Sequence, residues 1–158
     1  MSIEIIMKES EIAVAMKKEA VGCDTISDVM AEGYQKLFAY VGQQGKEIAG
    51  APYCKYTNGN EGFTQFDLEL GVPVSEPLPE QDGFYMAKTC EGKAACAMHT
   101  GAYKEIDKTY GALMEYLTAN NLESTGVYYD YYISNPAETP EDELLTKVIF
   151  PVSQEAAV

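Results

Sequence analysis

The chain has 158 residues, with 25 acidic side chains, 11 lysines and no arginine, and its formal net charge is −14. A nucleic-acid binder needs cations to contact the phosphates, so this charge balance argues against one. No apolar run approaches the roughly 18 residues of a membrane helix, and no secretory signal is visible, so we expect a cytoplasmic protein of one domain without a membrane partner. Four scattered cysteines and one histidine offer no zinc-ligand spacing, and we expect neither a metal nor a cofactor.

The first half of the chain predicts two strands, a helix and a hairpin, in that order. Thr25 and Asp28 resemble a capping box at the start of the helix, and Gly42 and Gly45 end it. Apolar and polar residues alternate from Phe66 to Val72, which is typical of a strand with one buried face. The expected elements are strands at 3–8 and 12–18, a helix that starts at about Thr25, and a hairpin at 52–57 and 63–73.

The second half predicts the same elements again. A helical stripe starts at Ile106 and continues through Tyr110 and Leu113 to Leu117. Two asparagines, at 120–121, end this helix. The expected elements are strands at 84–89 and 94–100, the helix, and a hairpin at 127–134 and 143–151.

An internal repeat explains why the two halves look alike. The pattern Y-x-x-L-x-x-Y begins at Tyr34 and again at Tyr110, and G-x-x-Y-x-x-Y begins at Gly50 and again at Gly126. The offset, 110 minus 34, is 76 residues at all six patterned positions. We therefore interpret the chain as a duplicated unit within one domain, 1–158. Its parts are repeat one at 1–74, a linker at 75–83, and repeat two at 84–158.

Two β-β-α-β-β units predict an α+β domain. An antiparallel sheet would pack one face on the two helices, because each element must bury its apolar side. The other face is left over, and near a pseudo-twofold axis it can form a ligand cleft.

Several motifs resemble those of the GyrI-like proteins. H-T-G-A-Y at 99–103 is similar to their H-x-G-x-Y element, and G-V-Y-Y-D-Y-Y-I-S-N-P at 126–136 is similar to G-x-x-[WY]-E-x-Y-L-x-D-P. E-L-L-T-K-V-I-F-P-V at 143–152 resembles their closing strand. In the first half, G-A-P-Y and L-E-L-G-V-P-V also fit. The resemblance covers nearly the whole chain.

This family also forms the effector-binding half of AraC-type and MerR-type multidrug regulators. The resemblance therefore implies a cleft for bulky apolar molecules, which are often cationic. It also implies an acid in a second-half strand, where this sequence has Asp130. Because the matched domain takes up the whole chain, we expect a standalone member without a helix-turn-helix domain.

The candidate ligand site centres on Asp130. If 127–134 is a strand, Tyr128, Asp130 and Tyr132 share one face, and Tyr129 and Tyr131 lie with Val127 and Ile133 on the other, which we expect to be core. Aromatic rings attract a cation by roughly 0.5–2 kcal/mol each, and a carboxylate removed from water gains from a positive partner. The residues expected to bind ligand are Asp130, Tyr128 and Tyr132, with their repeat counterparts Cys54 and Tyr56, and Glu69, which could face the cleft or water.

Two alternatives apply to the face that carries Asp130. It could be a solvated sheet surface. If Ser134 pairs with Glu143, Lys147 would lie opposite Asp130 and could neutralise it.

Three functions are consistent with the sequence. The leading one is a non-enzymatic sensor or sequestering protein that binds small apolar or cationic molecules. The second is a hydrolase of electrophilic natural products, with Asp130 as general base and Tyr56 or Tyr132 as proton donor. The third is interaction with a protein partner such as DNA gyrase or a separate regulator.

Overall fold

The computed structural model describes residues 2–22, 24–59, 64–80, 83–135 and 138–153. They form two compact units, which we call the central unit (residues 10–89) and the terminal unit (residues 1–9 and 90–158). Each unit is an antiparallel sheet with a helix packed on one face, so the predicted α+β class is confirmed. No helix among the described residues combines the length and apolar character needed to cross a membrane.

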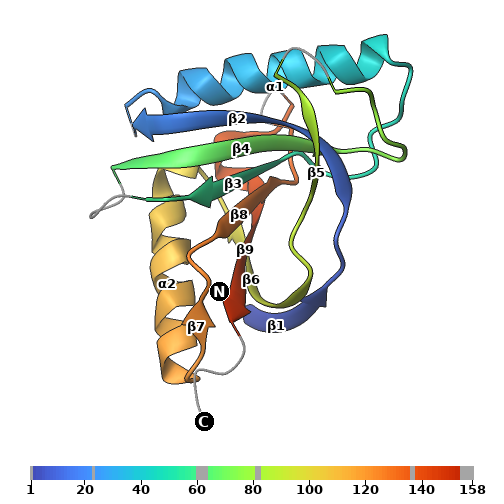
Figure 1. Cartoon of the computed structure of the whole chain (residues 1–158). Helices are drawn as coiled ribbons and strands as arrows, with labels where there is room; N and C mark the ends of the chain where they lie inside the picture. Colours follow the sequence, from blue (N-terminus) through green and yellow to red (C-terminus); the bar gives the residue numbers. More distant parts are fainter. Residues whose placement is uncertain (1, 23, 60–63, 81–82, 136–137, 154–158) are drawn as a thin grey trace. The chain divides into compact units, whose positions relative to one another are not determined.

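The central unit holds four strands and one long helix (Figure 1). Its sheet has the order β3-β4-β2-β5, with every neighbouring pair antiparallel. The helix α1 packs on β2 and β4. The elements are β2 (Ile12–Gly22), α1 (Ile26–Gln43), β3 (Tyr53–Thr57), β4 (Gln65–Pro73) and β5 (Tyr85–Lys88).

The terminal unit has the same plan, in the strand order β1-β6-β9-β8, with the short β7 also paired to β9. Figure 1 shows its helix α2 beside β7 and β9. The elements are β1 (Ile3–Lys8), β6 (Gly92–Thr100), a 3-10 turn (Tyr103–Glu105), α2 (Ile106–Ala119), β7 (Glu123–Ser124), β8 (Tyr128–Tyr132), a second 3-10 turn (Glu141–Glu143) and β9 (Leu145–Ser153).

Close packing of α1 on its sheet depends on Gly33. A Cβ atom on Gly33 would lie 2.3 Å from Cδ1 of Leu70, which is fully buried on β4. A side chain at this position would therefore force the buried side chain of Leu70 to shift. The contact also shows that Leu70 points toward α1, so the alternation of the strand turns Glu69 and Gly71 to the opposite face.

The terminal unit buries an apolar cluster between α2 and its sheet. Leu113 and Leu117 supply the helical side of this cluster, as the predicted helical stripe indicated. Val148 and Phe150 of β9 face them from the sheet. The cluster fixes which face of the terminal sheet is covered by the helix.

The first strand of each sequence repeat pairs with the second strand of the other repeat. β1, at the start of repeat one, pairs with β6, and β5, at the start of repeat two, pairs with β2. The repeats at 1–74 and 84–158 stay an interpretation of the sequence. Residue 63 of the expected hairpin and residues 81–82 of the expected linker lie outside the described residues.

Candidate functional site

A hollow in the central unit brings together residues from four strands. It encloses about 330 Å³. Glu69 of β4 lies in it and is half-buried, on the face of the sheet opposite α1. The hollow is lined by Lys17, Lys55, Thr57, Leu68, Glu69 and Tyr85.

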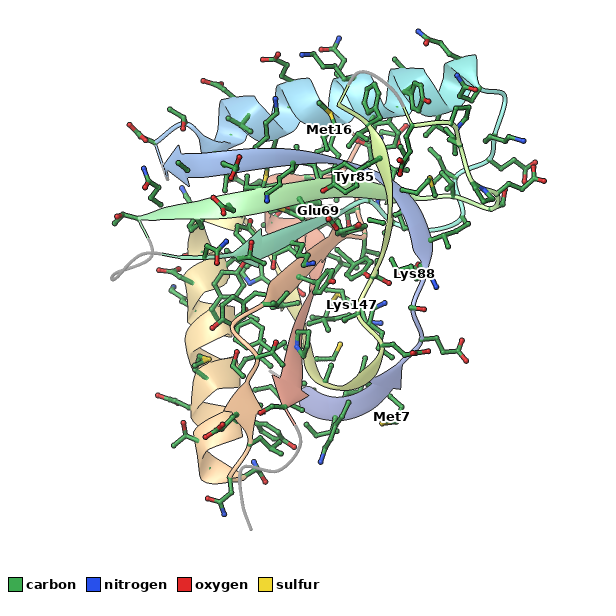
Figure 2. The ribbon with its side chains drawn as sticks, viewed as in Figure 1. Met7, Met16, Glu69, Tyr85, Lys88 and Lys147 are labelled. Atoms are coloured by element: carbon green, nitrogen blue, oxygen red, sulfur yellow. The ribbon has the colours of Figure 1, made fainter. Side chains whose placement is uncertain are left out.

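Two tyrosine hydroxyls hold the Glu69 carboxylate. Tyr53 of β3 donates a hydrogen bond of 2.9 Å to Oε2 of Glu69, and Tyr85 of β5 donates one of 2.9 Å to Oε1. Glu69 is on β4 and Tyr85 is on β5, the two strands on either side of β2, and Figure 2 labels both side chains. Each carboxylate oxygen thus has one tyrosine donor, and hydrogen bonds to an ionised acceptor are strong ones.

Gly71 makes room for one of these tyrosines. It lies directly opposite Tyr53 in the β3–β4 register, and a Cβ atom on Gly71 would fall 2.2 Å from Cζ of the Tyr53 ring. The ring lies across the glycine, and this brings its hydroxyl to Glu69. The missing side chain at Gly71 is therefore part of what positions Tyr53.

The hydroxyl of Tyr85 keeps the proton that it donates to Glu69. Burial raises the pKa of Tyr85 well above its ordinary value, and the neighbouring Glu69 charge and its hydrogen bond raise that pKa further. The hydroxyl therefore stays protonated at every physiological pH and donates to Glu69.

Asp130 lies on the face of its sheet that α2 covers. It is 2 % exposed, and the hydroxyl of Tyr110 on α2 donates a hydrogen bond to its carboxylate. The sequence analysis expected this face to be free of helices, and that expectation is wrong. Tyr128, on the same face as Asp130, packs against Phe150 of the α2 cluster. A ligand role for Asp130 stays a prediction.

The alternative in which Asp130 lies opposite Lys147 is wrong. In the β8–β9 register Asp130 lies opposite Val148, and Lys147 lies opposite Tyr131. The backbone amides of Ile133 and Ser134 both bond to the carbonyl of Leu145, so the Ser134–Glu143 pair that would place Lys147 opposite Asp130 does not form. A one-residue shift moves a side chain to the other face, so Lys147 cannot neutralise Asp130 across the strands.

The other predicted ligand residues also pack on helix-covered faces. Tyr132 contacts the ring of Tyr103 with centroids 5.6 Å apart. Cys54 is fully buried and lies opposite Leu70, which points toward α1. Tyr56 lies edge-on to Phe66 at 5.2 Å. Of the six residues predicted from the sequence, Glu69 is the one that lines the hollow.

The Glu69 arrangement has no equivalent in the terminal unit. Glu69 lies three residues before the start of V-P-V at 72–74, and Lys147 lies three residues before the start of F-P-V at 150–152. Their cross-strand partners, Lys55 and Tyr131, are also equivalent in register. The two units therefore carry opposite charges at the same strand position, and the carboxylate belongs to the central unit.

Sequence reasoning missed Lys17, Lys55, Tyr53 and Tyr85 as site residues. Tyr53 was visible as a repeat residue, but its hydroxyl partner depends on strand pairing. Lys17 and Lys55 join Glu69 only once the registers of β2 and β3 with β4 are known. No local pattern marks Tyr85.

Comparisons with known proteins agree with this fold. A family model described as GyrI-like small molecule binding domain matches residues 1–153. Comparison with curated proteins finds no match.

Solved structures similar to this chain share the fold at low sequence identity. The C-terminal domain of EcmrR aligns with a TM-score of 0.79 at 17% identity, covering 96% of this chain and 97% of that one. A hydrolase encoded by lin2189 from Listeria innocua aligns at 0.70 with 13% identity, covering 96% and 91%. SAV2435 bound to tetraphenylphosphonium aligns at 0.66 with 11% identity, covering 98% and 95%.

The chain is shorter than one of the proteins that it matches. EcmrR in its DNA complex aligns with a TM-score of 0.82 at 15% identity over 96% of this chain. The chain spans 57% of that EcmrR chain.

Proposed function

The chain belongs to the GyrI-like small molecule binding domain family, and from this premise we propose that it binds a small hydrophobic molecule in the hollow around Glu69. It would act as a cytoplasmic sensor or sequestering protein. The observation that carries the proposal is the half-buried Glu69 carboxylate, held by one tyrosine hydroxyl on each oxygen.

The Glu69 carboxylate can accept further hydrogen bonds from a ligand. An ionised carboxylate offers about four acceptor positions, and the two tyrosines occupy two of them. A cationic or hydrogen-bond-donating group on a ligand can use the remaining positions. Because both oxygens are already oriented, little further ordering is needed when the ligand binds.

The volume and lining of the hollow also support a small ligand. About 330 Å³ is at the lower end of the range for small-molecule sites. The Tyr85 ring and the stems of Lys17 and Lys55 provide apolar area beside the polar groups. A hydrophobic molecule with a cationic or hydrogen-bond-donating group is the expected ligand class, and the tetraphenylphosphonium bound to the structurally similar SAV2435 supports it.

The direct test is a binding titration with tetraphenylphosphonium, by calorimetry and by the shift of the melting temperature. Glu69→Gln keeps the size of the side chain and removes its charge, and we expect it to weaken binding about tenfold or more. Glu19→Gln, an exposed acid on β2 of the same unit, is the matched control and should bind as the wild type does. Equal affinities for all three proteins would contradict the proposal.

The same titration tests the site predicted from the sequence. If Asp130→Asn weakens binding and Glu69→Gln does not, the ligand is held at Asp130. Ligand roles for Tyr128, Tyr132, Tyr56 and Cys54, hydrolysis by Asp130 with Tyr56 or Tyr132, and interaction with gyrase also stay predictions.

A further inference from the structure

Two lysines flank Glu69 on the same face of the central sheet. Lys17 of β2 and Lys55 of β3 both lie directly opposite Glu69 of β4 in their antiparallel registers. Directly opposed side chains in such pairs have Cβ atoms about 4.5–5.5 Å apart. The three residues therefore form a row across three strands, with the carboxylate in the middle.

Neither lysine is the partner of Glu69. Among the residues that the structure describes, no salt bridge or hydrogen bond joins either ammonium group to the Glu69 carboxylate. Hydrogen bonds from Asn58 and Ala20 lower the pKa of the Asp67 carboxyl on β4, and the charge of Lys17 adds to this effect. The carboxylate oxygens accept from Tyr53 and Tyr85 instead. Lys55 is half-buried and Lys17 is exposed, and both line the hollow.

The charge of the hollow is opposite to that of the whole chain. Its lining carries two ammonium groups and one carboxylate, whereas the chain has a formal net charge of −14. A ligand with only positive charge would meet two like charges at close range, which costs free energy. A ligand with an acidic group would gain two cationic partners, and a cationic or donor group on the same ligand would offset the charge of Glu69, which lies between the two lysines.

We propose that the ligand of this hollow carries an anionic group, such as a carboxylate, which Lys17 and Lys55 hold while Glu69 accepts from its cationic or hydrogen-bond-donating part. The ligand class is thus a hydrophobic zwitterion or a hydrophobic acid with a donor group. This inference rests on the proposed function, because it concerns the same hollow.

A pair of probes isolates the anionic group. (4-Carboxybutyl)triphenylphosphonium and pentyltriphenylphosphonium have the same cation and the same chain length, and they differ by a carboxylate in place of a methyl group. We expect the wild type to bind the carboxylate compound about tenfold more tightly in low salt. The preference should shrink as sodium chloride is added, because exposed charges are screened.

Lysine variants show which residues cause the preference for the carboxylate compound. The double variant Lys17→Gln/Lys55→Gln should bind the two probes equally, with the affinity for the pentyl compound kept or improved. Lys88→Gln, an exposed lysine on β5 of the same unit, removes one positive charge and should retain the preference (Figure 2). Melting curves of all variants confirm folding before titration.

The outcomes separate the two proposals. If the wild type binds both probes equally, or if the double variant keeps the preference, the anion site is overturned and the proposed function stands. If neither probe binds, both proposals are overturned.

Discussion

The hydroxyl of Tyr110 on α2 donates a hydrogen bond to the carboxylate of Asp130 on β8, and this bond joins the helix of the terminal unit to its sheet. A carboxylate that is 2 % exposed is costly unless its oxygens find donors. The bond therefore gives Asp130 a role in packing the terminal unit.

Removing the donor should destabilise the protein. Tyr110→Phe deletes the hydroxyl and keeps the ring, so we expect the free energy of unfolding to fall by about 1–3 kcal/mol, because a buried oxygen of Asp130 loses its donor. Urea denaturation measures the change. Tyr116→Phe on the same helix is the control, since its ring packs on the same cluster. A similar loss in both variants would show that the bond to Asp130 has no special weight.

Filling the space at Gly71 should displace Tyr53. In Gly71→Ala the new methyl group would collide with the Tyr53 ring, and the bond from Tyr53 to Glu69 would be strained or lost. We expect a loss of about 1–3 kcal/mol in unfolding free energy, as for other overpacked sites.

Gly42→Ala provides a control of opposite sign for that experiment. Gly42 lies within α1, and a Cβ atom there would meet nothing within 4 Å. Alanine in a helix is favoured over glycine by about 0.5–1 kcal/mol, so this variant should gain stability. If Gly71→Ala is as stable as Gly42→Ala, the close approach of Tyr53 is wrong.

A reciprocal pair of bonds links the two ends of the central unit. The amide of Glu11 donates to Oγ1 of Thr89 at 2.8 Å, and the amide of Thr89 donates to the carbonyl of Glu11 at 2.9 Å. Thr89→Val keeps the shape of the buried side chain and removes this acceptor, so we expect a loss of about 1–3 kcal/mol in chemical denaturation. Thr118→Val, an exposed site on α2, should change stability far less.

The Cys96 thiol should make stability depend on alkaline pH. Burial raises the pKa of Cys96, the nearby Glu4 adds to this effect, and Lys147 opposes it. The unfolded chain therefore loses the Cys96 proton at a lower pH than the folded protein does, at a pKa of about 8.5. The contribution of Cys96 to the free energy of unfolding is complete below that pH and is lost as the pH rises above it. Urea denaturation at neutral and alkaline pH should show a steeper loss for the wild type than for Cys96→Ala. Parallel pH profiles would contradict the shift.

Local patterns in the sequence determined the elements and their order. Apolar alternation from Phe66 to Val72 predicted β4, and the stripe from Ile106 to Leu117 predicted α2, because each signal comes from neighbours a few residues apart. The α+β class and the family followed from the order of these elements and their motifs.

Tertiary structure alone decided the faces and the partners. Strand side chains have a period of two, so a shift of one residue between β8 and β9 placed Lys147 opposite Tyr131 and left Asp130 under α2. Tyr53 and Tyr85 are each 16 residues from Glu69 in the chain, and they meet it only because β3 and β5 join the same sheet. Such pairing is set by long-range backbone hydrogen bonds, which leave no local trace in the amino-acid sequence.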